Sequence, residues 1–231
     1  MAPARGREHR LRHTRQLLFP ALIAAVICGA CGSDRPDTVP IEAARHLPSG
    51  MTVTVKGFVT VPPGLFATFT GEQGFAVEDA TAGIYVALES QANFPLGKEV
   101  RVTGQLADIA ELIVIASRVE LVEPLTRQLV VQPQTITTGA VGAATEGRLV
   151  RMQGTVTRPI GDDRPYGYKI FLDDGSGEIQ VFVPVSTGID PFAPPGLQVG
   201  QRLTVVGFSG RFKETYEVIP RFAADLTMAA P

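Results

Sequence analysis

Two pairs of aspartates and a glutamate form the densest group of chemistry-bearing side chains in this sequence. They are Asp162-Asp163, Asp173-Asp174 and Glu178. Carboxylate oxygens that lie close together can hold a calcium ion, although this spacing does not match the loop of an EF-hand. The Asp-Gly-Ser-Gly run within the group is also ordinary hairpin chemistry between two strands. We favour the hairpin and predict no metal site and no cofactor.

Enzymes that use nucleophilic or zinc-dependent mechanisms need an imidazole or a thiolate at the site. After Cys31 the sequence contains no further cysteine and only one of its three histidines, His46, which stands in a polar segment where a solvated side chain is expected. Neither G-x-S-x-G nor G-x-x-x-x-G-K-[ST] occurs, so a nucleophile elbow and a phosphate-binding loop are both absent. We therefore predict no catalytic residues and no enzymatic activity.

Stacking of flat ligands on aromatic rings is the chemistry that the sequence supports better. Between 169 and 183 one phase of an alternating pattern is apolar and predicts a buried face. Its members are Ile170, Leu172, Ile179, Val181 and Val183. The opposite phase carries Lys169, Phe171, Gln180 and Phe182. A base stacked on an aromatic side chain gains about 1–3 kcal/mol, so Lys169, Phe171 and Phe182 are candidate ligand-binding residues.

Two further candidates occupy comparable outward positions. Arg151, with Gln153, lies in the outward phase of the strand predicted over 150–157, and Tyr85 lies in the outward phase of the first half of the chain. A competing interpretation has these aromatic side chains packed between two domains or under a loop. The acidic charge of the chain favours that alternative over ligand binding.

The strands that carry these residues occur twice along the chain. Gly57 aligns with Gly154 inside a strand of alternating polarity, and two further blocks align in the same order. The aligned segments are 52–60 with 150–157, 77–86 with 172–181, and 96–104 with 199–207. Two copies of one unit are therefore present.

Each unit contains about five predicted strands. A glycine inside the first strand is useful where a strand bends sharply to serve both sides of a small barrel. Five strands with that bend indicate an OB-type barrel, whereas a β-sandwich would need about seven strands. We predict an all-β protein of two tandem five-stranded OB-type barrels. In this fold the exposed side of strands 2 and 3, which carries Lys169, Phe171 and Phe182 in the second unit, is the usual binding face.

The block Leu96–Gly104, the hairpin Glu78–Ile84 and the linker Thr138–Val150 resemble tandem OB-fold modules of exported bacterial proteins, including non-catalytic regions of some extracellular nucleases. The resemblance covers roughly residues 50–226. It implies the fold and says little about activity, because the shared motifs are turns and core positions. No nuclease domain accompanies them here.

The N-terminus has the layout of a signal peptide. Five arginines stand in the first sixteen residues, followed by an apolar stretch over 17–30 that is too short for a bilayer-spanning helix. The segment Ile27–Asp34 resembles a bacterial lipobox, with Cys31 as the predicted lipidated residue. Ordinary secretory cleavage nearby is the alternative. Lipidation predicts a membrane-anchored protein of the bacterial cell envelope, and Gly32 favours the outer membrane over the inner.

These features divide the chain into five predicted segments: a signal peptide (1–30), a lipidated cysteine with a flexible tether (31–49), OB-fold domain 1 (50–124), a linker (125–146) and OB-fold domain 2 (147–228). Removing 1–30 takes five basic residues from 21 and Glu8 from 23 acidic ones, which leaves 16 against 22 and a net charge of −6. This sign opposes strong nonspecific binding to nucleic acid or anionic lipid.

The predicted function is a non-enzymatic, membrane-anchored binding module that engages an envelope or extracellular partner, either a protein or an oligomeric ligand. The alternative is single-stranded nucleic acid binding through the strand 2–3 face of the second barrel. A third hypothesis, a phosphodiesterase suggested by the nuclease-associated relatives, lacks candidate catalytic groups. The oligomeric state does not follow from the sequence.

Overall fold

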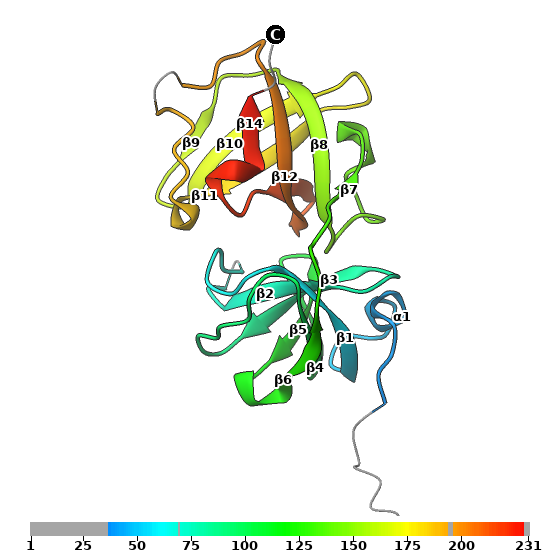
Figure 1. Cartoon of the computed structure of the whole chain (residues 1–231). Coiled ribbons are helices and arrows are strands. Elements are labelled where there is room, and N and C mark those ends of the chain that lie inside the picture. Colours follow the sequence, from blue (N-terminus) through cyan, green and yellow to red (C-terminus); the bar gives the residue numbers. More distant parts are fainter. Residues whose placement is uncertain (1–36, 69, 194–195, 229–231) are drawn as a thin grey trace, which may run out of the picture. The chain divides into compact units, whose positions relative to one another are not determined.

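The computed structural model describes residues 37–68, 70–193 and 196–228 (Figure 1). These residues belong to one compact unit, Pro36–Pro231. The predicted signal peptide 1–30 and the predicted lipidation site Cys31 lie outside the described residues. Among the helices of the described part, none has the length and apolar character to cross a bilayer.

The first half of the described chain forms a closed barrel of five strands, in the order β1-β2-β3-β5-β4 with β4 returning to β1 (Figure 1). The strands are β1 (Thr52–Val61), β2 (Gln73–Glu78), β3 (Gly83–Leu88), β4 (Lys98–Ile109) and β5 (Leu112–Ser117). β3 and β5 run parallel, and the other neighbours run antiparallel. After the 3-10 turn η1 (Val119–Leu121), β6 (Val122–Gln128) pairs with β4, so the first barrel continues past the predicted boundary at 124.

The second half repeats this topology in the order β8-β10-β11-β13-β12, with β12 returning to β8 (Figure 1). Its strands are β8 (Leu149–Val156), β10 (Gly167–Asp173), β11 (Ile179–Pro184), β12 (Arg202–Phe212) and β13 (Thr215–Ile219). The smaller elements are β7 (Gln134–Thr135), β9 (Gly161–Asp163), η3 (Val185–Thr187), η4 (Ala223–Asp225) and β14 (Leu226–Met228). The prediction of two tandem five-stranded OB-type barrels is confirmed.

Both barrels close with the same hydrogen bond, because the repeat fixes the same turn. The amide of Gly97 donates to the carbonyl of Val59 at 2.8 Å, and the amide of Gly200 donates to the carbonyl of Val156 at 2.8 Å. The two glycines have φ values of 76° and 86°, which glycine adopts without the steric cost of a Cβ atom. The aligned Leu-Gly and Val-Gly pairs in the sequence therefore mark the point where each barrel closes.

The segment predicted as a flexible tether differs from that expectation, because part of it packs on the first barrel. Helix α1 (Ile41–Arg45) buries Ile41 and Ala44 completely. The amide of Ile41 donates to Asp79 Oδ2 at 2.9 Å, in the hairpin between β2 and β3. An aspartate that accepts from the first amides of a helix satisfies donors that would otherwise lack partners.

The predicted linker repeats this arrangement on the second barrel. The 3-10 turn η2 (Thr138–Ala140) begins with the amide of Thr138, which donates to Asp174 Oδ2 at 3.2 Å. Thr138 follows Ile41 by 97 residues, the same offset that separates Gly154 from Gly57. The repeated unit therefore begins upstream of the first barrel strand, in residues whose polar composition suggested a tether and a linker.

Candidate ligand-binding groove

The outer face of β2 and β3 is covered, which corrects the expectation that Tyr85 binds ligand. Tyr85 is 2% exposed, its hydroxyl donates to the carbonyl of Phe66 at 2.9 Å, and burial raises its pKa. Its ring centroid lies 5.8 Å from that of Phe66 and 5.8 Å from that of Phe208 on β12. This packing agrees with the competing interpretation, in which the ring lies between two domains, and the buried ring also borders the groove described below.

Polar contacts accompany this aromatic cluster. Arg221 Nη1 donates to the carbonyl of Thr60 at 2.8 Å, and the amide of Leu149 donates to Glu78 Oε1. Burial raises the pKa of Glu78 to about 7, against the lowering effect of that amide and of nearby arginines. Strands of the first barrel therefore bind the start and the end of the second barrel directly.

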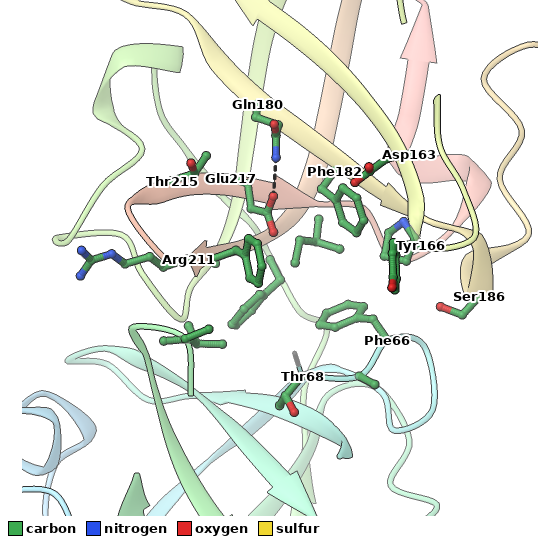
Figure 2. A pocket seen from close by; sticks show the side chains of 18 of the residues that line it. Phe66, Thr68, Asp163, Tyr166, Gln180, Phe182, Ser186, Arg211, Thr215 and Glu217 are labelled. Atoms are coloured by element: carbon green, nitrogen blue, oxygen red, sulfur yellow. Dashed lines mark hydrogen bonds between the residues drawn. The ribbon is translucent and has the colours of Figure 1, made fainter. Parts of the chain in front are cut away.

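Beside the aromatic cluster lies a groove with a volume of about 1050 Å³ (Figure 2). One wall consists of the outward faces of β10, β11 and β13, together with part of β12 and the turn after β9. The opposite wall belongs to the first barrel and contains the segment 66–68 and the turn between β4 and β5. The groove is thus on the strand 2–3 face of the second barrel, where the sequence predicts ligand binding.

Aromatic rings form much of the groove's lining. Phe182 projects from β11, Tyr166 from the turn between β9 and β10, and Phe66 from the opposite wall (Figure 2). Tyr166 is 73% exposed and Phe212, at the end of β12, is 38% exposed. Large exposed aromatic side chains around one concavity are typical of sites that bind flat or apolar groups.

A carboxyl and an amide lie side by side in this lining. Gln180 on β11 stands opposite Glu217 on the parallel strand β13, and Gln180 Nε2 donates to Glu217 Oε2 at 2.6 Å. Figure 2 shows the second carboxyl oxygen directed into the groove. Glu217 is buried, and this burial raises its pKa to about 7; Gln180 and Lys169 oppose the shift, and Asp163 adds to it.

The charged side chains around the groove neutralise one another. Lys169 Nζ lies 2.9 Å from Asp163 Oδ2, and Arg211 forms an ion pair with Glu111 of the first barrel. Such pairs leave little net positive potential for a phosphate backbone. A ligand in the groove would therefore contact aromatic rings and hydrogen-bonding groups, and would meet little net charge.

Of the candidate ligand-binding residues on β10 and β11, two line the groove and one lies outside it. The buried phase, from Ile170 to Val183, is buried as predicted. Lys169 and Phe182 line the groove, but Phe171 does not: the guanidinium of Arg158 covers its ring, with Cζ 4.3 Å from the centroid. The alternating pattern identified the face correctly and could not show which part of it a neighbouring arginine covers.

Arg151 does not join the groove. It is exposed on β8 and lies six residues before Thr157, whose amide donates to the carbonyl of Phe171. At a strand rise of about 3.3 Å per residue, these positions are roughly 20 Å apart. Arg151 is also absent from the residues that line the groove around Phe182.

The aspartate pairs are used within turns and ion pairs. Asp173 accepts from the amides of Gly175 and Gly177, and Asp174 accepts from Thr138 and Ser176, as a hairpin requires. No group of three potential metal-ligating side chains occurs in the described residues. His46 is exposed beside Glu42.

Sequence reasoning missed Glu217, Tyr166 and Phe66. The outward phase of 215–219 contains Glu217, so alternation alone could have placed it on the outer face. Its position beside Gln180 depends on the parallel pairing of β11 with β13. Tyr166 and Phe66 lie in loops, where periodicity carries no signal.

The fold and the groove define a tandem OB-type protein with a concave, aromatic-lined face. Neither the family models nor the curated proteins include a match to this chain. Among solved structures, a murine DNA binding protein bound to double-stranded DNA is 11% identical, with a TM-score of 0.41, covering 77% of this chain and 97% of its own. The assignment to the OB fold rests on the strand order and closure described above.

Two further structures are similar at the same level. The tetrameric p202 HIN2 is 13% identical, with a TM-score of 0.37, covering 79% of this chain and 95% of its own. The p204 HINb domain is 12% identical, with a TM-score of 0.38, covering 79% of this chain and 98% of its own.

Proposed function

We propose that this protein is a non-enzymatic binding module that captures single-stranded nucleic acid in the groove on the β10–β11 face of its second barrel. The observation that carries the proposal is the aromatic, hydrogen-bonding lining of this groove. Unpaired bases can leave the strand axis, stack on aromatic side chains and present their edges to polar groups. The groove's volume of about 1050 Å³ lies just above the usual range for small-molecule sites, which is ample for a base with its sugar.

The neutralised charges set the expected character of this binding. Lys169 and Arg211 are already paired with carboxylates, so few phosphates would displace counterions. The salt dependence of affinity scales with the number of neutralised phosphates. We expect weak, stacking-dominated binding that changes little with salt, unlike the steep dependence of a basic nucleic-acid-binding surface.

Phe182→Ala is expected to weaken the binding of single-stranded DNA by roughly 5- to 150-fold, because one stacked base contributes about 1–3 kcal/mol. The measurement is the fluorescence anisotropy of a labelled mixed-sequence oligonucleotide, titrated with the full chain at low and moderate salt. Phe171→Ala is the matched control, because that ring is covered by Arg158 outside the groove. No binding at low salt, or a larger loss in Phe171→Ala than in Phe182→Ala, would refute the proposed site.

The proposed location is the bacterial cell envelope, with the chain held on a membrane through acyl chains on Cys31. The support is the basic and apolar leader and the lipobox-like segment Ile27–Asp34. Metabolic labelling with a radioactive fatty acid is expected to mark the wild-type protein and to fail with Cys31→Ser. Equal labelling of both proteins would contradict the proposed anchor.

A protein partner in the envelope is the second candidate ligand. The paired cations favour it over nucleic acid, and exposed side chains that line the groove supply contact surface: Val185 at 43% and Tyr166 at 73%. This candidate replaces the first if the anisotropy titration gives no binding to single-stranded DNA or RNA at either salt concentration.

A further inference from the structure

We propose that the groove selects guanine, with the Gln180–Glu217 pair reading the Watson–Crick edge of a base that stacks on the aromatic lining. This inference rests on the proposed capture of single-stranded nucleic acid and adds the identity of the base. It depends on the geometry of two side chains that the sequence analysis did not bring together.

The first step is the position of Glu217 itself. β13 directs Val218 into the core of the second barrel, so Glu217 faces the groove and contributes nothing to that core. It is nevertheless only 7% exposed, and the described residues give it a hydrogen bond from Gln180 but no ion pair. Burying a carboxyl group without an ion-pair partner is costly, and the nearby Lys169, which is paired with Asp163, offsets only part of that cost. A perturbed acid in a concave site is a candidate for ligand recognition.

The second step is the order of hydrogen-bonding groups that the pair presents. Gln180 Nε2 carries two hydrogens, of which one is donated to Glu217 Oε2 and the other is available. Each carboxylate oxygen accepts more than one hydrogen bond, so Oε2 and Oε1 remain acceptors. The pair therefore offers a donor followed by two acceptors, and Figure 2 shows Oε1 directed into the groove.

The third step is the choice among bases. The Watson–Crick edge of guanine presents an acceptor, O6, followed by two donors, N1–H and the N2 amino group, which complements the Gln180–Glu217 pair at all three positions. The Watson–Crick edge of cytosine presents a donor followed by two acceptors, as the Gln180–Glu217 pair does. It would therefore place donor opposite donor and acceptor opposite acceptor. Adenine offers one donor beside an acceptor, and thymine and uracil offer one donor between two acceptors. Guanine is therefore the base that satisfies both carboxylate oxygens.

The protonation state of Glu217 makes this selection pH-dependent. Burial raises the pKa of Glu217 to about 7, and protonation removes the two-acceptor face. The charged groups that line the same groove are Lys169 on β10, Asp163 on β9 and Arg211 on β12. The described lining from the first barrel contains no charged side chain. Because guanine binds the ionised carboxylate, its affinity rises as the pH rises through about 7 and reaches a plateau above it.

The experiment compares three labelled pentanucleotides, d(TTGTT), d(TTCTT) and d(TTATT), in anisotropy titrations with the full chain at pH 6 and pH 8. At pH 8 we expect about a tenfold preference for the guanine oligomer, as one bidentate pair provides. At pH 6 we expect that preference to be smaller. Glu217→Gln, which replaces one acceptor by a donor, should bind all three oligomers with similar affinities at both pH values.

Glu178→Gln is the matched control, because it makes the same substitution at a carboxyl group that pairs with Arg158 and does not line the groove. It should keep the guanine preference. Binding of all three oligomers by the wild-type chain without preference, or a preference that survives in Glu217→Gln, would overturn this inference and leave the capture of nucleic acid standing. The absence of any binding would instead overturn the proposed function. The melting temperature of Glu217→Gln at pH 8 should equal or exceed that of the wild type, which separates lost recognition from lost folding.

Discussion

Phe208→Ala is expected to lower the free energy of unfolding by about 3–5 kcal/mol, the usual cost of truncating a buried phenylalanine. Phe208 belongs to β12 of the second barrel, yet its ring packs against the first barrel. It is 1% exposed, and its centroid lies 5.8 Å from those of Phe66 and Tyr85. In the wild type the Phe208 ring covers the outer face of β2 and β3, and the alanine variant leaves a cavity in its place. Urea denaturation of the wild type and the variant measures the change.

Phe192→Ala is the matched control for that prediction. Phe192 is 49% exposed and makes an edge-to-face contact with Tyr168 at 5.6 Å between centroids. Its removal should cost about 1 kcal/mol or less. Equal losses in the two variants would mean that the aromatic cluster between the barrels contributes little to stability, contrary to the packing described here.

Arg221→Ala should also lower the free energy of unfolding by about 3–5 kcal/mol, because it leaves a buried carboxylate without its cation. Arg221 Nε and Nη2 donate to the two carboxylate oxygens of Asp225 at 2.9 Å each, and Nη1 donates to the carbonyl of Thr60 at 2.8 Å. Both side chains are 8% exposed. The single substitution therefore removes a fork that joins the end of the second barrel to β1.

The double variant Arg221→Ala, Asp225→Ala makes this prediction specific. Removing both partners eliminates the uncompensated charge, so the double variant should be more stable than Arg221→Ala alone. Arg164→Ala, which breaks an exposed ion pair with Asp162, should cause no measurable change. A double variant that is less stable than Arg221→Ala would contradict this prediction, because Asp225 would then stabilise the chain mainly through the amides of residue 221 and Phe222, from which it also accepts.

The strand pattern and the internal repeat were sufficient to predict the barrels. Gly57 and Gly154 align, and so do the glycines that close the two barrels, because the same turns and bends recur in both copies. Alternation also gave the correct buried face of β10 and β11. Turns and strand alternation are encoded by residues close together in the chain, and the repeat shows them twice. A single sequence is therefore enough to detect them.

The fate of the predicted binding residues depended on contacts between distant segments. Tyr85 lies in the outward phase of β3, but Phe208 covers it from a strand more than a hundred residues later. Phe171 and Phe182 share one face, and only the ring of Phe171 is covered by Arg158. Periodicity tells which residues share a face, whereas tertiary packing decides whether that face is open.

The Gln180–Glu217 pair and the first helix were missed for a related physical reason. Glu217 meets Gln180 through a parallel strand pair, which alternation along either strand does not encode. Helix α1 spans five residues, too short for a helical pattern, and is held by Asp79 and by burial of Ile41. Such elements acquire their structure from the partner that they pack against.

Photo-crosslinking tests the capture of nucleic acid most directly, because it reports where a bound strand lies. The full chain would be irradiated with a single-stranded oligonucleotide that contains guanine and 5-iododeoxyuridine, and the adducts would be located by mass spectrometry. We predict adducts at Tyr166, Phe182 or Phe212, which line the groove. Adducts confined to other surfaces, such as the region of Arg151, or a yield no higher than that of the heat-unfolded chain, would contradict the account.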